Sequence, residues 1–247
     1  MRVERESGRR RIEVDFATEP FDSAPRMLLR STGLYLSHLP FLATVTLVVY
    51  LPVKLAVQLV FSLLNVSNES VLSYALLEVL DLVLSALVIP AAIYGVVGKL
   101  RSGRRPRVWE SLRWGRRQWG RLLWNKVKVE ITVGLRALLL IVPGITAMAR
   151  LALTDAVVAI EADSAAEPLA RSSDLTHGRR WRVFFVLLPF LPVDLFGAWL
   201  VLAVPSRVGF ALADCALAVA EQWLTVAVML MYLGVAGRSK ERAAKKR

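Results

Sequence analysis

The chain has 247 residues, of which 55% are hydrophobic, and its 32 Lys and Arg exceed its 20 Asp and Glu by 12 charges. A soluble domain has about 45–50% apolar residues, whereas the apolar residues here form long blocks with the charges between them. Basic residues that flank such blocks meet anionic lipid headgroups, so the charge does not indicate a nucleic-acid partner. The sequence predicts one all-α membrane domain, a polytopic bundle of transmembrane helices.

Residues 1–23 form a polar segment that we expect on the cytoplasmic side. Residues 1–26 alternate basic and acidic side chains and lack the apolar stretch of a cleaved signal peptide. The first apolar block is therefore expected to act as an uncleaved signal anchor. A short basic segment over 25–37 leads into that block.

Residues 24–236 are predicted to form the membrane domain. A transmembrane helix needs about 20 mainly apolar residues, and lipid forces the backbone polar groups of each span to bond within a helix. The six predicted spans are 39–61, 71–97, 127–142, 145–160, 182–204 and 209–236. Pro143 and Gly144 interrupt one apolar run between the third and fourth spans, and because Pro ends helices and Gly permits turns, we expect a tight turn there.

Lys and Arg side chains gather in alternate connections. Seven lie in residues 1–37, eleven in 98–128, four in 161–182 and six in the basic tail 237–247. The connections 62–70 and 143–146 have none, and 205–208 has only Arg207. Cytoplasmic loops carry the excess of Lys and Arg, so six spans with both termini in the cytoplasm satisfy every connection.

Residues 107–124 have the pattern of a helix that lies in the membrane interface. At the helical period, Trp109, Trp119 and several Leu fall on one arc, while most of the Arg fall on the opposite arc. Trp at headgroup level with Arg toward the phosphates is typical of interfacial helices. A helix packed on the cytoplasmic ends of the spans is the alternative, and both can hold. The residues predicted to bind headgroups here are Arg107, Trp109, Arg113, Arg117, Trp119 and Arg121.

Residues 165–177 predict a second short helix of this kind. His177 followed by Gly178 fits a helix end that needs a left-handed residue. The next residues, Arg179, Arg180 and Trp181, are also predicted to bind lipid headgroups and to anchor the following span. A short basic helix followed by two spans would then occur three times, over 24–97, 106–160 and 165–236, which suggests a threefold repeat.

Several ionisable side chains lie inside the predicted spans, where they are costly and are either functional or paired. Five carboxylates could line a polar translocation path: Glu78, Asp81, Asp194, Asp214 and Glu221. The alternative is that carboxylates pair between helices with Lys54, Arg136 and Arg150. The sequence does not decide between these two interpretations.

No motif of an enzyme is found in the sequence. It contains two histidines, His38 and His177, and lacks the Gly-x-Ser-x-Gly, His-Glu-x-x-His and phosphate-loop patterns. We therefore expect no catalytic residues, no metal site and no cofactor.

One region is similar to a known family. Its motifs are the apolar stretch 137–145 that ends in Pro-Gly-Ile, Arg-Leu-Ala-Leu at 150–153, the stretch 156–161 that ends in Glu161, and the stretch 169–184 with Leu-Thr-His-Gly-Arg-Arg-Trp-Arg. Over these 48 residues the chain resembles the bacterial membrane domain attached to glycerophosphoryl diester phosphodiesterases and its stand-alone relatives. The resemblance implies a six-span module of the bacterial cytoplasmic (inner) membrane. It does not imply the phosphodiesterase activity, which belongs to a separate soluble domain.

These observations predict a non-enzymatic integral membrane protein that organises the membrane, or binds lipids or a partner, at the cytoplasmic face. Its expected partners are anionic headgroups of membrane lipids. A homo-oligomer, a membrane partner and a place in a larger complex are left open. The alternative function is a transporter of a small solute or lipid that uses the intramembrane carboxylates.

Overall fold

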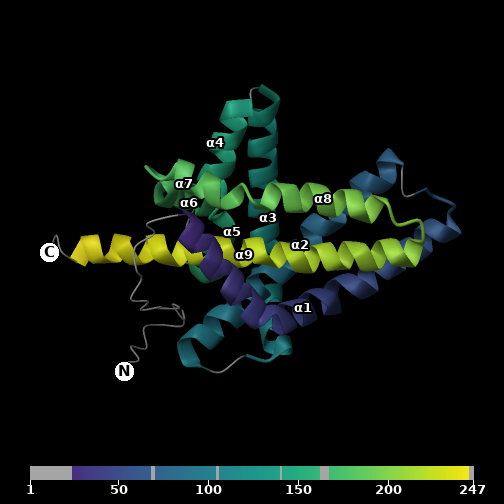
Figure 1. Ribbon diagram of the computed structural model, residues 1–247, viewed down its shortest axis with the longest axis horizontal. Helices are drawn as coiled ribbons and strands as arrows, with labels where there is room; N and C mark the ends of the chain where they lie inside the picture. The colour runs from purple at the N-terminus through teal and green to yellow at the C-terminus, as the bar shows by residue number, and fades with distance from the viewer. Residues whose placement is uncertain (1–23, 68–69, 104–105, 140, 162–166, 245–247) are drawn as a thin grey trace.

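A computed structural model describes residues 24–67, 70–103, 106–139, 141–161 and 167–244 (Figure 1). The regular structure of these residues is entirely α-helical, as the sequence predicts. The helices are α1 (Ala24–Leu63), α2 (Val71–Ser102), α3 (Val108–Leu139), α4 (Ile141–Leu151), α5 (Thr154–Glu161), α6 (Pro168–Thr176), α7 (Arg180–Leu187), α8 (Phe190–Leu202) and α9 (Arg207–Ala244).

Four stretches of the described chain are long and apolar enough to cross a membrane. They are Ala24–Leu63, Val71–Leu100, Val142–Glu161 and Arg207–Ala236. Two of the six predicted spans are not among them. The block 182–204 is divided between α7 and α8, and the block 127–142 continues the charged helix α3, so that one helix contains both the interfacial pattern and the third predicted span. The threefold repeat is not confirmed.

The predicted turn at residues 142–144 is wrong. Pro143 and Gly144 lie in the first turn of α4, where the backbone N–H that Pro lacks would have no partner in the helix. Gly144 instead permits close packing, because a Cβ on it would come within 2.8 Å of the Cα of Ala137 on α3. The Pro-Gly pair therefore belongs to the packing of an α3–α4 hairpin.

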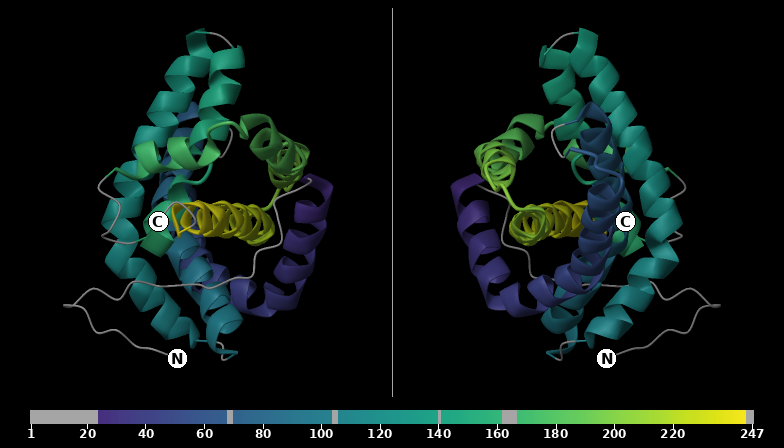
Figure 2. Two further views of the ribbon diagram at one scale, coloured as in Figure 1. Left: turned by 90° about the vertical axis from the view of Figure 1, so that its left-hand side faces the viewer. Right: turned by 90° about the vertical axis from the view of Figure 1, so that its right-hand side faces the viewer.

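Helix α9 runs through the middle of the molecule. It contacts α1 most extensively and also meets α2, α5, α6, α7 and α8. The α3–α4 hairpin runs across α9 instead of alongside it, as the two side views of Figure 2 also show. Hydropathy alone predicts spans but gives no direction to them, so this crossing arrangement was not foreseen.

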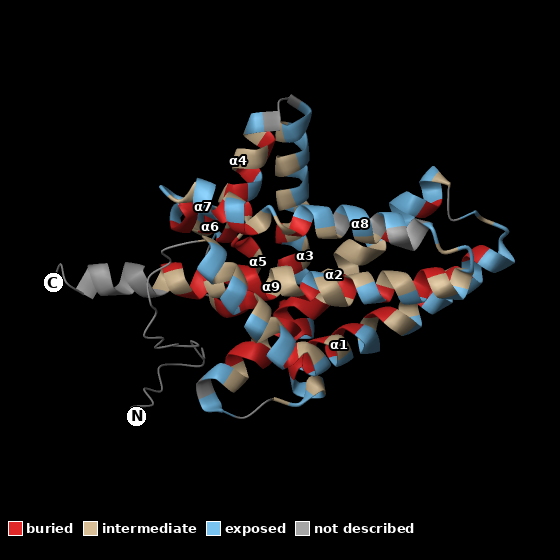
Figure 3. Ribbon diagram, viewed as in Figure 1, coloured by how far each residue is buried: buried red, intermediate tan, exposed pale blue. Residues whose placement is uncertain are grey.

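Buried residues gather where α1, α2, α3, α5 and α9 meet (Figure 3). Large apolar side chains are exposed elsewhere, on α8 (Leu195, Phe196 and Trp199) and on the first half of α2 (Val71, Leu72 and Val79). Soluble monomers rarely expose contiguous apolar surface of this kind. Together with the four candidate spans, these faces are consistent with a membrane protein in contact with lipid.

Helices α2 and α3 share the most extensive contact between any two helices in the described chain. Tyr94 and Trp114 stack with ring centroids 5.3 Å apart, and the indole N–H of Trp119 donates to the carbonyl of Val83 at 3.1 Å. Gly115 faces the backbone of α2, where a Cβ would collide with the carbonyl oxygen of Leu87. A small residue at this position is thus a condition for the close approach of the two helices.

Candidate functional site

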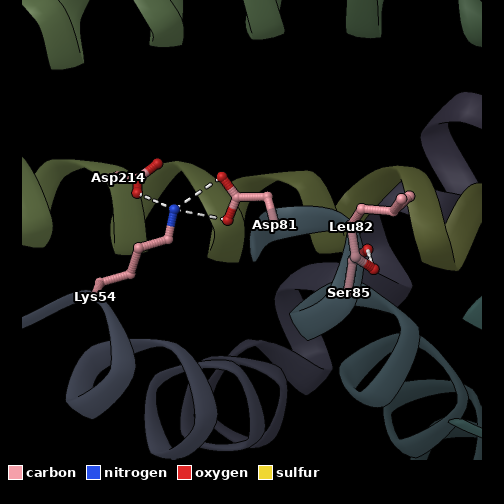
Figure 4. A network of polar contacts seen from close by, with 5 residues as sticks. All are labelled: Lys54, Asp81, Leu82, Ser85 and Asp214. Carbon is pink, nitrogen blue, oxygen red and sulfur yellow. Dashed lines mark hydrogen bonds and ion pairs between the residues drawn. The ribbon is translucent and has the colours of Figure 1, made fainter. Parts of the chain in front are cut away.

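Three charged side chains from three helices meet inside the bundle. The ammonium of Lys54 on α1 lies 2.7 Å from a carboxylate oxygen of Asp81 on α2 and 2.5 Å from one of Asp214 on α9. Lys54 reaches between the two carboxylates, as Figure 4 shows. Its side chain is 2% exposed, against 37% for Asp81 and 17% for Asp214. We call these three residues the ion triad.

The ion triad contains two of the five carboxylates predicted for a translocation path. Glu78 lies one turn from Asp81 on α2 but is exposed, and Glu221 is exposed on α9. The side chain of Asp194 is not among those that the structure describes. The structure therefore joins Asp81 and Asp214 through Lys54, the pairing that the sequence left as an alternative. Arg150 makes no such pair and donates to the hydroxyl of Ser173.

A second polar contact lies one turn further along α2. The ammonium of Lys126 on α3 donates to the hydroxyl of Ser85 at 2.8 Å and lies 3.9 Å from a carboxylate oxygen of Asp155 on α5. Sequence analysis had not connected these three residues, because they are far apart in the chain and belong to three helices. They tie α2, α3 and α5 together beside the ion triad.

A basic pocket of about 480 Å³ opens between α4 and the junction of α6 and α7. Four of its ten lining residues carry basic side chains, Arg179, Arg180, Arg182 and His177, and Trp181 lies beside them. The opposite wall is α4, with Ile145, Thr146 and Ala149. Guanidinium groups bind phosphate through paired hydrogen bonds, so the pocket combines an anion-binding side with an apolar side.

The end of α6 turns the chain toward this pocket. His177 is the C-cap residue of α6. Gly178 has a φ of 73°, the left-handed conformation that the sequence predicts there. The hydroxyls of Ser172 and Thr176 donate to the carbonyl of Arg150 and so fix α6 against the end of α4. The arginines that follow are thereby held beside α4.

One buried hydrogen-bond donor in the pocket region is unsatisfied. The Nε of Arg180 is buried and has no hydrogen-bond partner among the described residues. A buried donor without a partner is uncommon and often marks a site that binds water or an ion. Trp181 is 66% exposed, so its ring is free to lie against a membrane or a bound chain.

Another junction holds α5, α6 and α9 together near the pocket. Glu161 at the end of α5 accepts a hydrogen bond from the hydroxyl of Tyr232 on α9 at 2.8 Å and pairs with Arg171 on α6 at 3.2 Å. Glu161 and the Arg171 segment belong to the motifs that carry the family resemblance. Their role in this structure is to join helices.

The predicted headgroup-binding residues of α3 fall into two groups. Trp109, Arg113 and Arg117 are exposed, and so is Arg107 just before the helix. Trp119 is also exposed, but its indole N–H donates a hydrogen bond to α2, and Arg121 is half-buried. The helix thus packs on α2 through one face and leaves basic and aromatic side chains exposed elsewhere, and their binding to lipid headgroups stays a prediction.

The residues on the α4 side of the pocket were missed by sequence analysis. Ile145, Thr146 and Ala149 are ordinary apolar or small residues of a predicted span, and only the fold brings them to the Arg179 segment. The basic run itself was visible in the sequence. Within the described chain, no group of three or more His, Cys, Asp or Glu is placed to hold a metal ion.

Fold and site together define the class, an all-helical protein with candidate membrane-spanning helices, a buried ion triad and a basic pocket. No protein-family model, curated protein or solved structure matches this chain. The resemblance to the phosphodiesterase-associated membrane domain therefore stays a prediction.

Proposed function

We propose that this chain is a non-enzymatic protein of the bacterial cytoplasmic membrane that binds the anionic headgroup of a lipid in the basic pocket, at the cytoplasmic face. The observation that carries the proposal is the pocket itself, which has three arginines on one side and Ile145 and Phe184 among its apolar residues. The anionic headgroup of a lipid would bind to the arginines, and the acyl chains of the same lipid would pack against the apolar side. The exposed basic face of α3 would add a weaker, less specific attraction of about 1 kcal/mol per basic residue.

The number of membrane crossings decides on which side the pocket lies. The predicted six crossings put the start of α4 on the outer side, yet Ile145 and Thr146 share the pocket with the Arg179 segment, which the charge pattern predicts to be cytoplasmic. A second order also has four crossings, but it differs from the four candidate spans in one member: the pair α7 and α8 crosses in place of Val142–Glu161, beside α1, α2 and α9. In this order the α3–α4 hairpin lies along the cytoplasmic face. We favour this order, because it keeps the pocket, all basic connections and both termini on one side.

A reporter experiment distinguishes the two orders. A topology reporter inserted at residue 140, between α3 and α4, is expected to show cytoplasmic activity, because the hairpin does not cross. A reporter after residue 247 is cytoplasmic in both orders and serves as the positive control. Periplasmic activity at residue 140 would restore the six-crossing order, and periplasmic activity after residue 247 would contradict both.

The headgroup site is tested with the full chain in lipid nanodiscs. Arg180→Gln is expected to weaken binding of phosphatidylglycerol by roughly 10- to 100-fold, because a charge-assisted hydrogen bond contributes about 1.5–3 kcal/mol. Native mass spectrometry or a lipid-exchange titration measures the change. Phosphatidylcholine, which has no net charge, is expected to bind weakly to both proteins.

The matched control is Arg116→Gln, which removes the same charge from an exposed position on α3. It is expected to weaken binding only several-fold, as loss of one nearby surface charge should. Equal losses in the two variants would mean a diffuse basic surface without a pocket site. Equal binding of both lipids by the wild-type protein would remove the electrostatic basis of the proposal.

The transporter alternative has less support. Of its five carboxylates, Asp81 and Asp214 meet each other only through the ammonium of Lys54, which occupies the space between them. Such a contact joins helices, and a bound solute is not needed to explain it.

A further inference from the structure

The ion triad does not balance its own charge. Lys54 brings one positive charge, and Asp81 and Asp214 bring two negative charges when both are ionised. Both carboxylates touch the same ammonium nitrogen, so they are also close to each other. Net charge inside the membrane is costly, and two neighbouring carboxylates resist simultaneous ionisation.

No other positive side chain reaches the ion triad in the described structure. Tyr50, Cys215 and Glu221 lie near it from α1 and α9, and Glu78 and Ser85 lie one turn to either side of Asp81 on α2. The nearest further cation is Lys126, which is engaged with Ser85 and Asp155. None of these groups supplies the missing positive charge, and Glu78 and Glu221 add negative charge when ionised.

Unsatisfied polar groups lie beside the ion triad. Gln58 follows Lys54 by one turn on the same buried face of α1, is 4% exposed, and has neither amide atom hydrogen-bonded within the described chain. A buried amide in this state calls for a partner such as water. Ordered water at this position would also let a proton reach the carboxylates.

Asp81 is the member of the ion triad that is open to its surroundings. Its side chain is 37% exposed, compared with 2% for Lys54. One turn closer to the start of α2 lies the exposed Glu78, followed by Tyr74 one turn further out. These side chains share one face of α2 and form a polar route toward the 62–70 connection.

We propose that the pair Asp81 and Asp214 holds one exchangeable proton, carried by one carboxyl group or the other, so that the ion triad is a proton-binding site inside the membrane. Water outside the bundle donates the proton along the α2 face, and the carboxylate pair accepts it. The charge of the ion triad then changes from −1 to zero. This site is separate from the basic pocket and does not depend on the proposed lipid binding.

Infrared spectroscopy of the full chain in lipid vesicles tests the proposal by counting protonated carboxyl groups. A carboxylic acid has a C=O stretching band that a carboxylate lacks and that shifts in D₂O. At neutral pH the wild-type protein is expected to show the band of one such group. Asp81→Asn and Asp214→Asn each leave one carboxylate opposite Lys54, so the band should disappear in both.

Lys54→Met gives the opposite expectation, because two carboxylates without a cation would both take up a proton and the band should double. Glu130→Gln, at an exposed position of α3, is the matched control and should leave the band unchanged. Should one of the variants fail to fold, the wild-type band and its loss on raising the pH still decide the matter. A wild-type protein without the band at neutral pH, or a band that persists in Asp81→Asn, would overturn the proposal.

Discussion

Lys54→Met is expected to destabilise the protein by about 3–5 kcal/mol, the largest effect of any single substitution considered. Removing one partner of a buried charge network leaves the remaining charges without compensation. Asp81 on α2 and Asp214 on α9 would then lose the ammonium that now lies 2.7 and 2.5 Å from them. They avoid an uncompensated buried charge only by taking up protons, which costs the folded state free energy at neutral pH because both groups are ionised in the unfolded chain. The measurement is the unfolding midpoint of the purified protein in mixed detergent micelles.

Two further variants separate charge from side-chain volume. Lys128→Met removes a lysine that is exposed on α3 and lies over the Trp124 ring at 5.2 Å, so it should cost no more than about 1 kcal/mol. The triple variant Lys54→Met, Asp81→Asn, Asp214→Asn removes every charge of the ion triad and should recover much of the loss. A Lys54→Met protein as stable as Lys128→Met would show that the ion triad does not hold α1, α2 and α9 together.

The members of the ion triad were all visible in the sequence, but their meeting was not. Hydropathy places Lys54, Asp81 and Asp214 inside predicted spans, and the cost of isolated charges in lipid requires each to be paired or functional. The choice between these two depends on how α1, α2 and α9 rotate about their axes. The rotation of each helix about its axis is set by packing between segments that are distant in the chain, and local sequence patterns do not predict that packing.

The path of α3 was the part of the fold that local patterns described least well. Apolar residues over 127–142 predict a span, yet in α3 they continue a helix whose preceding part, residues 108–126, is about five turns long and carries charged residues and Trp. Hydropathy averaged over a short window detects only the apolar second half of α3. The contacts of Trp114 and Trp119 with α2 determine the direction of the whole helix. A segment's apolar content thus sets its solvent, while its long-range contacts set its direction.

The basic pocket shows the same division. The Arg179, Arg180 and Trp181 run predicts an anion-binding segment, because these side chains suit phosphate and the interface. The wall opposite depends on Ser172 and Thr176 bonding to the carbonyl of Arg150, which brings α4 alongside. Ser and Thr occur in many parts of this chain, so these two hydroxyls carried no recognisable signal in the sequence.

Gly115→Ala is the second substitution with a large expected effect. A Cβ at this position would collide with the backbone carbonyl of Leu87 and lie 3.1 Å from the Cβ of Ala91. A backbone oxygen cannot turn aside as the end of a long side chain can, so α3 would have to move away from α2. We expect a loss of about 1–3 kcal/mol, as for other over-packed sites, seen as a lower unfolding midpoint in detergent.

Gly120→Ala is a close control, since Gly120 lies on the same helix, is exposed, and has open space where its Cβ would be. Ala favours a helix over Gly by about 1 kcal/mol, so this variant should be slightly more stable than the wild type. The two substitutions add the same methyl group to the same helix and are expected to act in opposite directions. If both substitutions stabilised the protein, α3 would not pack on α2 through Gly115. The contact that holds the α3–α4 hairpin across α9 would then be missing.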